Sequence, residues 1–277
     1  MKFFSMWWDR QTEDKKADVR MLVAEHRLEF MNAGWSMHDE ACTHVDDMIN
    51  NMQIGHEFLK REFDYVPRIG WSIDPFGHSN TNARILAEMG FDAWFYARMD
   101  WSEREKRLNT REMQWVWRPS WDSLGSSAEI WTGVFLDMYW WPWGFSYDER
   151  DYGADPVISD PTLETFNAEQ KARDMYYYAK DMSTHYKGNH MFIPYGTDFA
   201  FANAHLTFSS SDALIEYFNE NYDDMTLMYS TPYQFIDAIK EEGTKWPTKY
   251  TDSFPYADDP EDFWTGFFSS RADSKSQ

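Results

Sequence analysis

The sequence predicts an α/β fold built on a parallel sheet. Segments with helical spacing of apolar residues alternate along the chain with short apolar runs that turn residues interrupt. The 277 residues are 43% hydrophobic, which is enough to bury a sizeable core. Strands and helices that alternate in this way form a parallel sheet, either open or closed into a barrel. In such folds the chemistry lies at the carboxyl ends of the strands.

The first half of the chain supplies most of the predicted strands. Three segments have the spacing of amphipathic helices, namely residues 11–26, 43–63 and 82–89. Five runs are strand-like, namely residues 27–31, 68–73, 92–97, 112–117 and 129–136.

The second half begins with a long aromatic loop, roughly residues 139–160. Helices are expected at 161–186, 211–222 and 231–241, with a strand at 226–229. Residues 245–277 form an irregular, aromatic C-terminal segment. We expect a single domain over residues 1–277.

Composition excludes several classes of partner. Lys and Arg number 26 and Asp and Glu number 47, so the formal net charge is −21. Nucleic acids and anionic membranes bind basic patches, so neither is expected as a partner. No apolar run approaches the ~18 residues of a membrane span, and the first ten residues are not a signal peptide. Aromatic side chains make up 19% of the chain, which suits either core packing or stacking on sugar rings.

Three charged residues follow predicted strands and are therefore candidates for chemistry: Asp74, Arg98 and Asp198. Two carboxylates from different strand ends can act as the nucleophile and the general acid of a retaining glycosidase. On spacing alone, both also fit ordinary turn or cap residues, and such weak motifs more often have that structural role. Arg98 could bind a carboxylate or a sugar hydroxyl, or form an ordinary ion pair. The aromatic run from Tyr139 to Trp143 could form a binding surface or pack inside a buried loop, and the two alternatives are about equally supported.

The histidines do not form an obvious metal site. His44 and Asp46 would project about 200° apart on a helix, so they are poor joint ligands. His78 follows Asp74 by four residues and could bind a metal or orient a neighbour, although turn histidines are common. A metal-dependent sugar deacetylase would need an Asp/His/His triad, which these eight histidines do not supply.

Five strings resemble the signatures of glycoside hydrolase family 38, the α-mannosidases, and the lysosomal-type branch looks closest. Their order and gaps agree with the family over about residues 3–271. The strings are Phe4 to Trp8 (FSMWW), Gly34 to Ala41 (GWSMHDEA), Trp71 to Ser79 (WSIDPFGHS), Gly196 to Phe199 with Asn203-Ala204, and Pro255 to Asp258 with Phe263 to Arg271.

The resemblance implies a retaining exo-α-mannosidase that removes terminal mannose from glycans. Asp74 matches the family's nucleophile and zinc ligand, and Asp198 matches its acid/base. Arg98 and Tyr139 match residues that lie near or contact the substrate. The implied fold is a parallel (β/α) barrel of the glycosidase type. The implied location is the lysosome or another secretory or vacuolar lumen, although no targeting signal is visible.

The sequence also departs from the family pattern. The family's His-x-Asp-x-Gly-Trp motif should precede Phe4, and a further zinc histidine should follow Gln277. Of the expected Zn²⁺ ligands only Asp74 is present. We therefore expect an incomplete barrel without its first strand, in a chain that is inactive alone and whose partner is the remainder of the enzyme. The alternative is a non-catalytic mannose-binding remnant.

Overall fold

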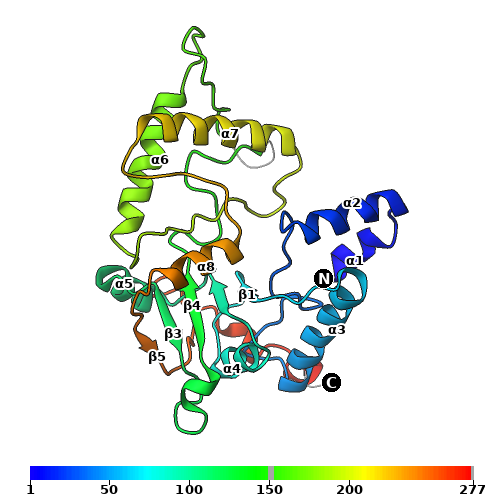
Figure 1. Cartoon of the computed structure of the whole chain (residues 1–277). Helices are drawn as coiled ribbons and strands as arrows, with labels where there is room; N and C mark the ends of the chain where they lie inside the picture. Colours follow the sequence, from blue (N-terminus) through cyan, green and yellow to red (C-terminus); the bar gives the residue numbers. More distant parts are fainter. Residues whose placement is uncertain (149–152, 276–277) are drawn as a thin grey trace. The chain divides into compact units, whose positions relative to one another are not determined.

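The chain divides into two compact units. Unit 1 comprises Met1–Val134 and Lys245–Gln277, and unit 2 comprises Phe135–Thr244. The computed structural model describes residues 1–148 and 153–275, and Figure 1 shows their secondary structure. Each unit has its own helices and its own apolar core.

Unit 1 contains the sheet and most of the helices. The α-helices of unit 1 are α1 (Lys2–Trp8), α2 (Glu13–Ala24), α3 (Val45–Phe63), α4 (Asn80–Glu88), α5 (Trp101–Thr110) and α9 (Ala272–Lys275). The strands are β1 (Ile69–Ser72), β2 (Ala93–Tyr96), β3 (Gln114–Trp117), β4 (Ile130–Val134) and β5 (Thr248–Lys249). Two short 3-10 helices are η1 (Gly125–Ala128) and η2 (Gly266–Phe268).

The described strands form one five-stranded sheet in the order β1-β2-β4-β3-β5. The pairs β1–β2, β2–β4 and β3–β5 are parallel, whereas β3–β4 is antiparallel. The predicted α/β class is confirmed. The antiparallel pair departs from a wholly parallel sheet: the segment that joins β3 to β4 contains only the short helix η1, whereas the crossover of a parallel pair is usually an α-helix. Closure into a barrel stays a prediction.

The strand predicted at residues 27–31 does not form. Asn32 and Ala33 follow it with φ angles of 54° and 60°, so the backbone turns where a ladder would continue. Asn32 contacts the edge of β1 instead: its N–H donates to the carbonyl of Ile69 (2.6 Å), and its Oδ1 accepts from the N–H of Trp71 (3.3 Å). One residue thus takes the place of a paired strand.

Large aromatic side chains fill the core of unit 1. Trp94 of β2, with Trp115 and Trp117 of β3, is fully buried, and the rings of Trp94 and Trp117 stack with centroids 5.4 Å apart. Part of the high aromatic content is therefore core.

Unit 2 is built on a pair of helices that pack against each other, α6 (Ala168–Ser183) and α7 (Ala204–Asn221), followed by α8 (Pro232–Glu241). The core between α6 and α7 includes Met175, Leu214 and Phe218. The N-cap Asn203 accepts from the N–H of Leu206, so α7 begins before the predicted residue 211. The strand predicted at 226–229 does not form. No helix in the described ranges is long and apolar enough to cross a membrane.

Candidate active site around Asp74

A tight turn begins at Asp74, two residues after β1 ends at Ser72. The turn runs from Asp74 to Gly77, where φ is +105°, a region that side-chain-bearing residues rarely adopt. A Cβ atom at Gly77 would lie 2.3 Å from Cε1 of Phe254. The turn therefore needs a glycine here, both for its backbone angle and for the close approach of the Phe254 ring.

Arg98, which follows β2, binds the Asp74 carboxylate. Its Nε and Nη2 lie 2.6 and 2.5 Å from Oδ1 of Asp74. The Asp74 side chain is 49% exposed, whereas that of Arg98 is 11% exposed. Oδ2 of Asp74 has no hydrogen-bond partner among the described residues. One oxygen is thus held in place while the other stays available for chemistry.

Three aromatic rings surround the Arg98 guanidinium. Its Cζ lies 4.6 Å from the ring centroid of Trp264, 5.2 Å from that of Phe76 and 5.7 Å from that of Tyr256. Nη1 also donates to Oη of Tyr256 at 3.4 Å. Burial opposes the charge of Arg98, but the hydrogen bonds to Tyr256 and Asp74 outweigh it and raise the pKa of the guanidinium. Arg98 is therefore a fixed, permanently charged partner of Asp74.

Tyr256 extends this chain of contacts to a second carboxylate. Its phenol is buried and donates to Oδ1 of Asp258 at 2.7 Å. Burial, followed by the hydrogen bond with Asp258, raises the pKa of Tyr256 to about 12. Tyr256, Asp258 and Trp264 belong to the strings that resemble the family signatures, although the sequence alone indicated no role for them. Their presence in those strings is the signal that could have singled them out.

Asp74 lies on the wall of an open groove in unit 1, about 1670 Å³ in volume. Three further aspartates, Asp39, Asp47 and Asp252, line the same groove with Phe76. The surroundings of Asp74 are thus acidic and aromatic. This character suits a neutral, hydroxyl-rich ligand better than an anion.

The other two predicted site residues belong to unit 2. Asp198 is exposed and lies next to Phe199, which is 82% exposed. Tyr139 is buried, with its ring centroid 4.3 Å from that of Trp140. Their approach to Asp74 stays a prediction, because Asp74 belongs to the other unit.

The aromatic run that begins at Tyr139 contains both buried and exposed side chains, so it includes loop packing as well as an aromatic surface. Tyr139 and Trp141 are buried, whereas Trp140 is partly exposed and Trp143 is 99% exposed. The predicted loop 139–160 includes residues 149–152, which lie outside the described residues.

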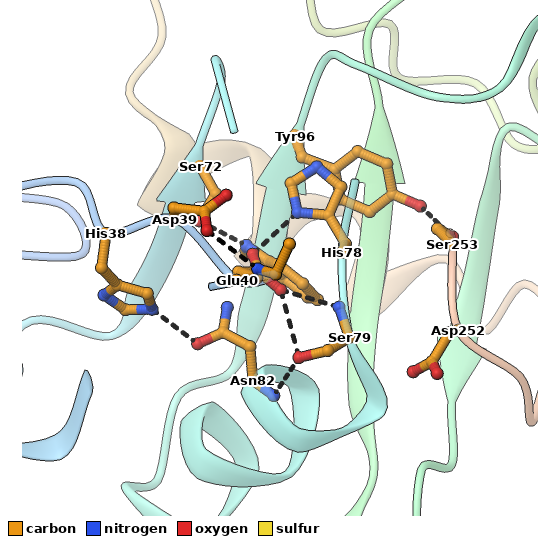
Figure 2. A network of polar contacts seen from close by, with 12 residues as sticks. His38, Asp39, Glu40, Ser72, His78, Ser79, Asn82, Tyr96, Asp252 and Ser253 are labelled. Carbon is orange, nitrogen blue, oxygen red and sulfur yellow. Dashed lines mark hydrogen bonds and ion pairs between the residues drawn. The ribbon is translucent and has the colours of Figure 1, made fainter. Parts of the chain in front are cut away.

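The two histidines considered as metal ligands, His44 and His78, have local structural partners. His44 is the N-cap of α3 and accepts from the N–H of Asp46 at 3.3 Å. His78 is fully buried against Glu40, and Figure 2 shows this network. In residues 1–148 and 153–275, no three His, Cys, Asp or Glu side chains lie together as a metal site. Catalytic zinc takes three protein ligands, so the residues around Asp74 do not by themselves fit a zinc ion.

Comparison with known proteins decides the family. The sequence profile of the glycosyl hydrolases family 38 N-terminal domain matches residues 1–259. The chain belongs to glycoside hydrolase family 38. It is 42% identical over 273 residues to the lysosomal alpha-mannosidase of Dictyostelium discoideum, covering 97% of this chain and 26% of that protein. It is 38% identical over 274 residues to the human lysosomal alpha-mannosidase, covering 97% and 27%.

A solved structure supports the fold of this family 38 chain. An alpha-mannosidase from Enterococcus faecalis V583 superimposes with a TM-score of 0.64 at 15% identity, covering 87% of this chain and 24% of that one. The family 38 chain thus spans about a quarter of the length of the relatives that it matches. The resemblance inferred from the five strings is confirmed at the level of the family.

Proposed function

We propose that this chain is part of a retaining exo-α-mannosidase that removes terminal mannose from glycans. Asp74 is the nucleophile, Asp198 is the acid/base, and Arg98 and Tyr139 contribute to substrate binding. The paired contact between Arg98 and Asp74 at the ends of two adjacent parallel strands carries the proposal. Family membership and the names of the matched relatives support it.

The geometry around Asp74 suits a nucleophile. Of the two Asp74 oxygens, Arg98 donates only to Oδ1, so it restrains the rotation of the carboxylate while Oδ2 can attack the anomeric carbon. The same guanidinium stabilises the carboxylate again when water releases the sugar. Asp198 would give its proton to the leaving oxygen and later accept one from water.

Zinc belongs to this proposal only as a cofactor that the whole protein binds. Asp74 would supply one ligand, and the others would come from outside these 277 residues. No step of the mechanism is routed through zinc, because the described residues do not assemble a site for it.

Both units are proposed to belong to one domain, because the match to the family's N-terminal domain runs across both of them. Closure of the sheet into an incomplete barrel belongs to the same proposal. The two relatives reported above are named lysosomal, which supports the lysosome or a related lumen as the location. The remainder of the enzyme is proposed as the partner of this chain.

Hydrolysis of a chromogenic α-mannoside by the purified chain, with added zinc, tests the activity. Asp74→Asn and Asp198→Asn should abolish any release of the chromophore, whereas the exposed Asp64→Asn should not change it. Where the chain turns over the mannoside, a 5-fluoro-mannosyl fluoride should label the peptide that contains Asp74. Labelling of another carboxylate, or undiminished activity in Asp74→Asn, would overturn the assignment.

A mannose-binding remnant is the second candidate, favoured by the exposed indoles of Trp140 and Trp143. In that case mannose would perturb ligand NMR signals, and no labelling or hydrolysis would occur. Replacing Trp143 with Ala should then weaken the binding.

A further inference from the structure

Glu40 has a buried carboxylate that the proposed mechanism does not use. Its side chain is 0% exposed, and its Oε1 lies 2.8 Å from Nδ1 of His78. Its Oε2 accepts from the backbone N–H of Ser79 at 2.8 Å. Figure 2 shows these contacts converging on Glu40. Glu40 therefore binds the far end of the loop that starts at Asp74.

The surroundings of Glu40 keep its carboxylate in place. The preceding residue, Asp39, accepts from the N–H groups of Ala41 and Cys42, which shapes the turn. Ser79 is the N-cap of α4, so Glu40 lies at the positive end of this helix. A buried carboxylate is costly unless hydrogen bonds satisfy it. Here the loop itself supplies those hydrogen bonds.

The contact with Glu40 determines which nitrogen of His78 carries the proton. A carboxylate oxygen accepts hydrogen bonds, so Nδ1 must be the donor. The His78 ring lies against Tyr96, with centroids 4.0 Å apart, and its Nε2 is buried with no partner in the described part of the chain. When the neutral imidazole is protonated at Nδ1, Nε2 carries only a lone pair that accepts no hydrogen bond. A proton on Nε2 would instead be a buried donor without an acceptor.

Ser253 fixes the main chain of the same loop from the other side. Its carbonyl accepts from the N–H of His78 at 3.1 Å, and its N–H donates to the carbonyl of His78 at 2.8 Å. Only residues 73–79 lie between β1 and α4. Since β1 holds the loop at Ser72, and Glu40 and Ser253 hold it at residues 78 and 79, the backbone of Asp74 has little room to move.

We propose that Glu40 is a positioning residue for Asp74. Glu40 holds His78 as the Nδ1–H tautomer and restrains Ser79, and through them it fixes the loop that presents Asp74 to Arg98. The catalytic consequence rests on the proposed function, whereas the tautomer and the order of the loop do not. Two independent readouts therefore distinguish a failure of the positioning role of Glu40 from a failure of the proposed function.

The first readout is spectroscopic and needs no activity. In the wild-type chain, a long-range ¹H–¹⁵N spectrum should show His78 protonated at Nδ1. Glu40→Gln keeps the shape of the side chain and places an amide N–H beside Nδ1, so His78 should change to the Nε2–H tautomer. Hydrogen exchange of the His78 and Ser79 amides should become about tenfold faster, because a charge-assisted hydrogen bond is lost. Exchange in β2 should stay unchanged. Glu88→Gln, at an exposed glutamate that pairs with Arg84 on α4, is the matched control.

An Nε2–H tautomer in the wild-type chain would overturn the proposal, even if Glu40→Gln does not fold. Unchanged loop exchange in a folded Glu40→Gln would also overturn it. Where the chain hydrolyses the chromogenic mannoside, Glu40→Gln should lower kcat at least about tenfold with little change in KM. A kcat of Glu40→Gln equal to that of the wild-type chain would overturn the proposal. If the wild-type chain does not hydrolyse the mannoside, the hydrogen exchange of the His78 and Ser79 amides decides whether the proposal holds. Full activity in Asp74→Asn would overturn the proposed function alone.

Discussion

Replacing Gly77 with alanine should destabilise unit 1 by about 2–5 kcal/mol. The φ angle of +105° costs an L-residue roughly 1–2 kcal/mol. The added Cβ would meet Cε1 and Cδ1 of Phe254 at 2.3 and 2.4 Å, which adds about 1–3 kcal/mol of overpacking. The Phe254 ring cannot move far without its backbone, because the neighbouring Ser253 pairs with His78.

Gly90→Ala is the matched control for this prediction. Gly90 also has a positive φ, +83°, but a Cβ there would meet nothing within 4 Å. Gly90→Ala should therefore lower the free energy of unfolding by only the roughly 1–2 kcal/mol that the positive φ angle costs. Urea unfolding followed by tryptophan fluorescence gives both free energies, and hydrogen exchange in β2 assigns the loss to unit 1. Equal losses for the two variants would refute the steric argument.

Three further predictions concern other parts of the chain. Burial raises the pKa of Tyr256 to about 12, against about 10 in the unfolded chain. The free energy of unfolding should therefore fall by about 1.4 kcal/mol per pH unit as pH rises from about 10 to 12. Tyr256→Phe should reduce this slope, measured by urea unfolding at each pH. Burial lowers the pKa of His56, so stability should fall as pH drops below about 6.5, and His56→Gln should flatten this dependence in thermal melts; an equally steep dependence would contradict the assignment. Phe218→Ala should cost unit 2 about 3–5 kcal/mol, with faster hydrogen exchange in α6 and α7 and unchanged exchange in β2.

The sequence predicted the elements that have strong local signals. The helix over residues 43–63 agrees with α3, because its apolar stripe is regular and its N-cap and last turn are well defined. The strand around Trp94 agrees with β2, whose four residues are all buried. Helices α1 and α5 were missed. Helix α5 has no buried residue and α1 buries only two, so neither has a clear apolar stripe.

The errors arise where tertiary contacts override local pattern. The alternation of residues 27–31 resembles a strand, but the positive φ of Asn32 ends it, and no local rule predicts that backbone angle. Asp74 and Arg98 could be selected as strand-end residues, because parallel strands end at one edge of a sheet. Two of the three aromatic rings around Arg98, those of Tyr256 and Trp264, come from far along the chain, which spacing alone cannot indicate.

The contact between Asn32 and β1 affects how the sheet behaves in solution. An outer strand with unpaired N–H and carbonyl groups is a template on which other chains can add strands and aggregate. Asn32 occupies the carbonyl of Ile69 and the N–H of Trp71, so an incoming strand would first have to displace it. At the opposite edge β5 is only two residues long, which is too short for an effective template. Both edges are thus protected against intermolecular pairing, β1 by the backbone and side chain of a single residue and β5 by its short length.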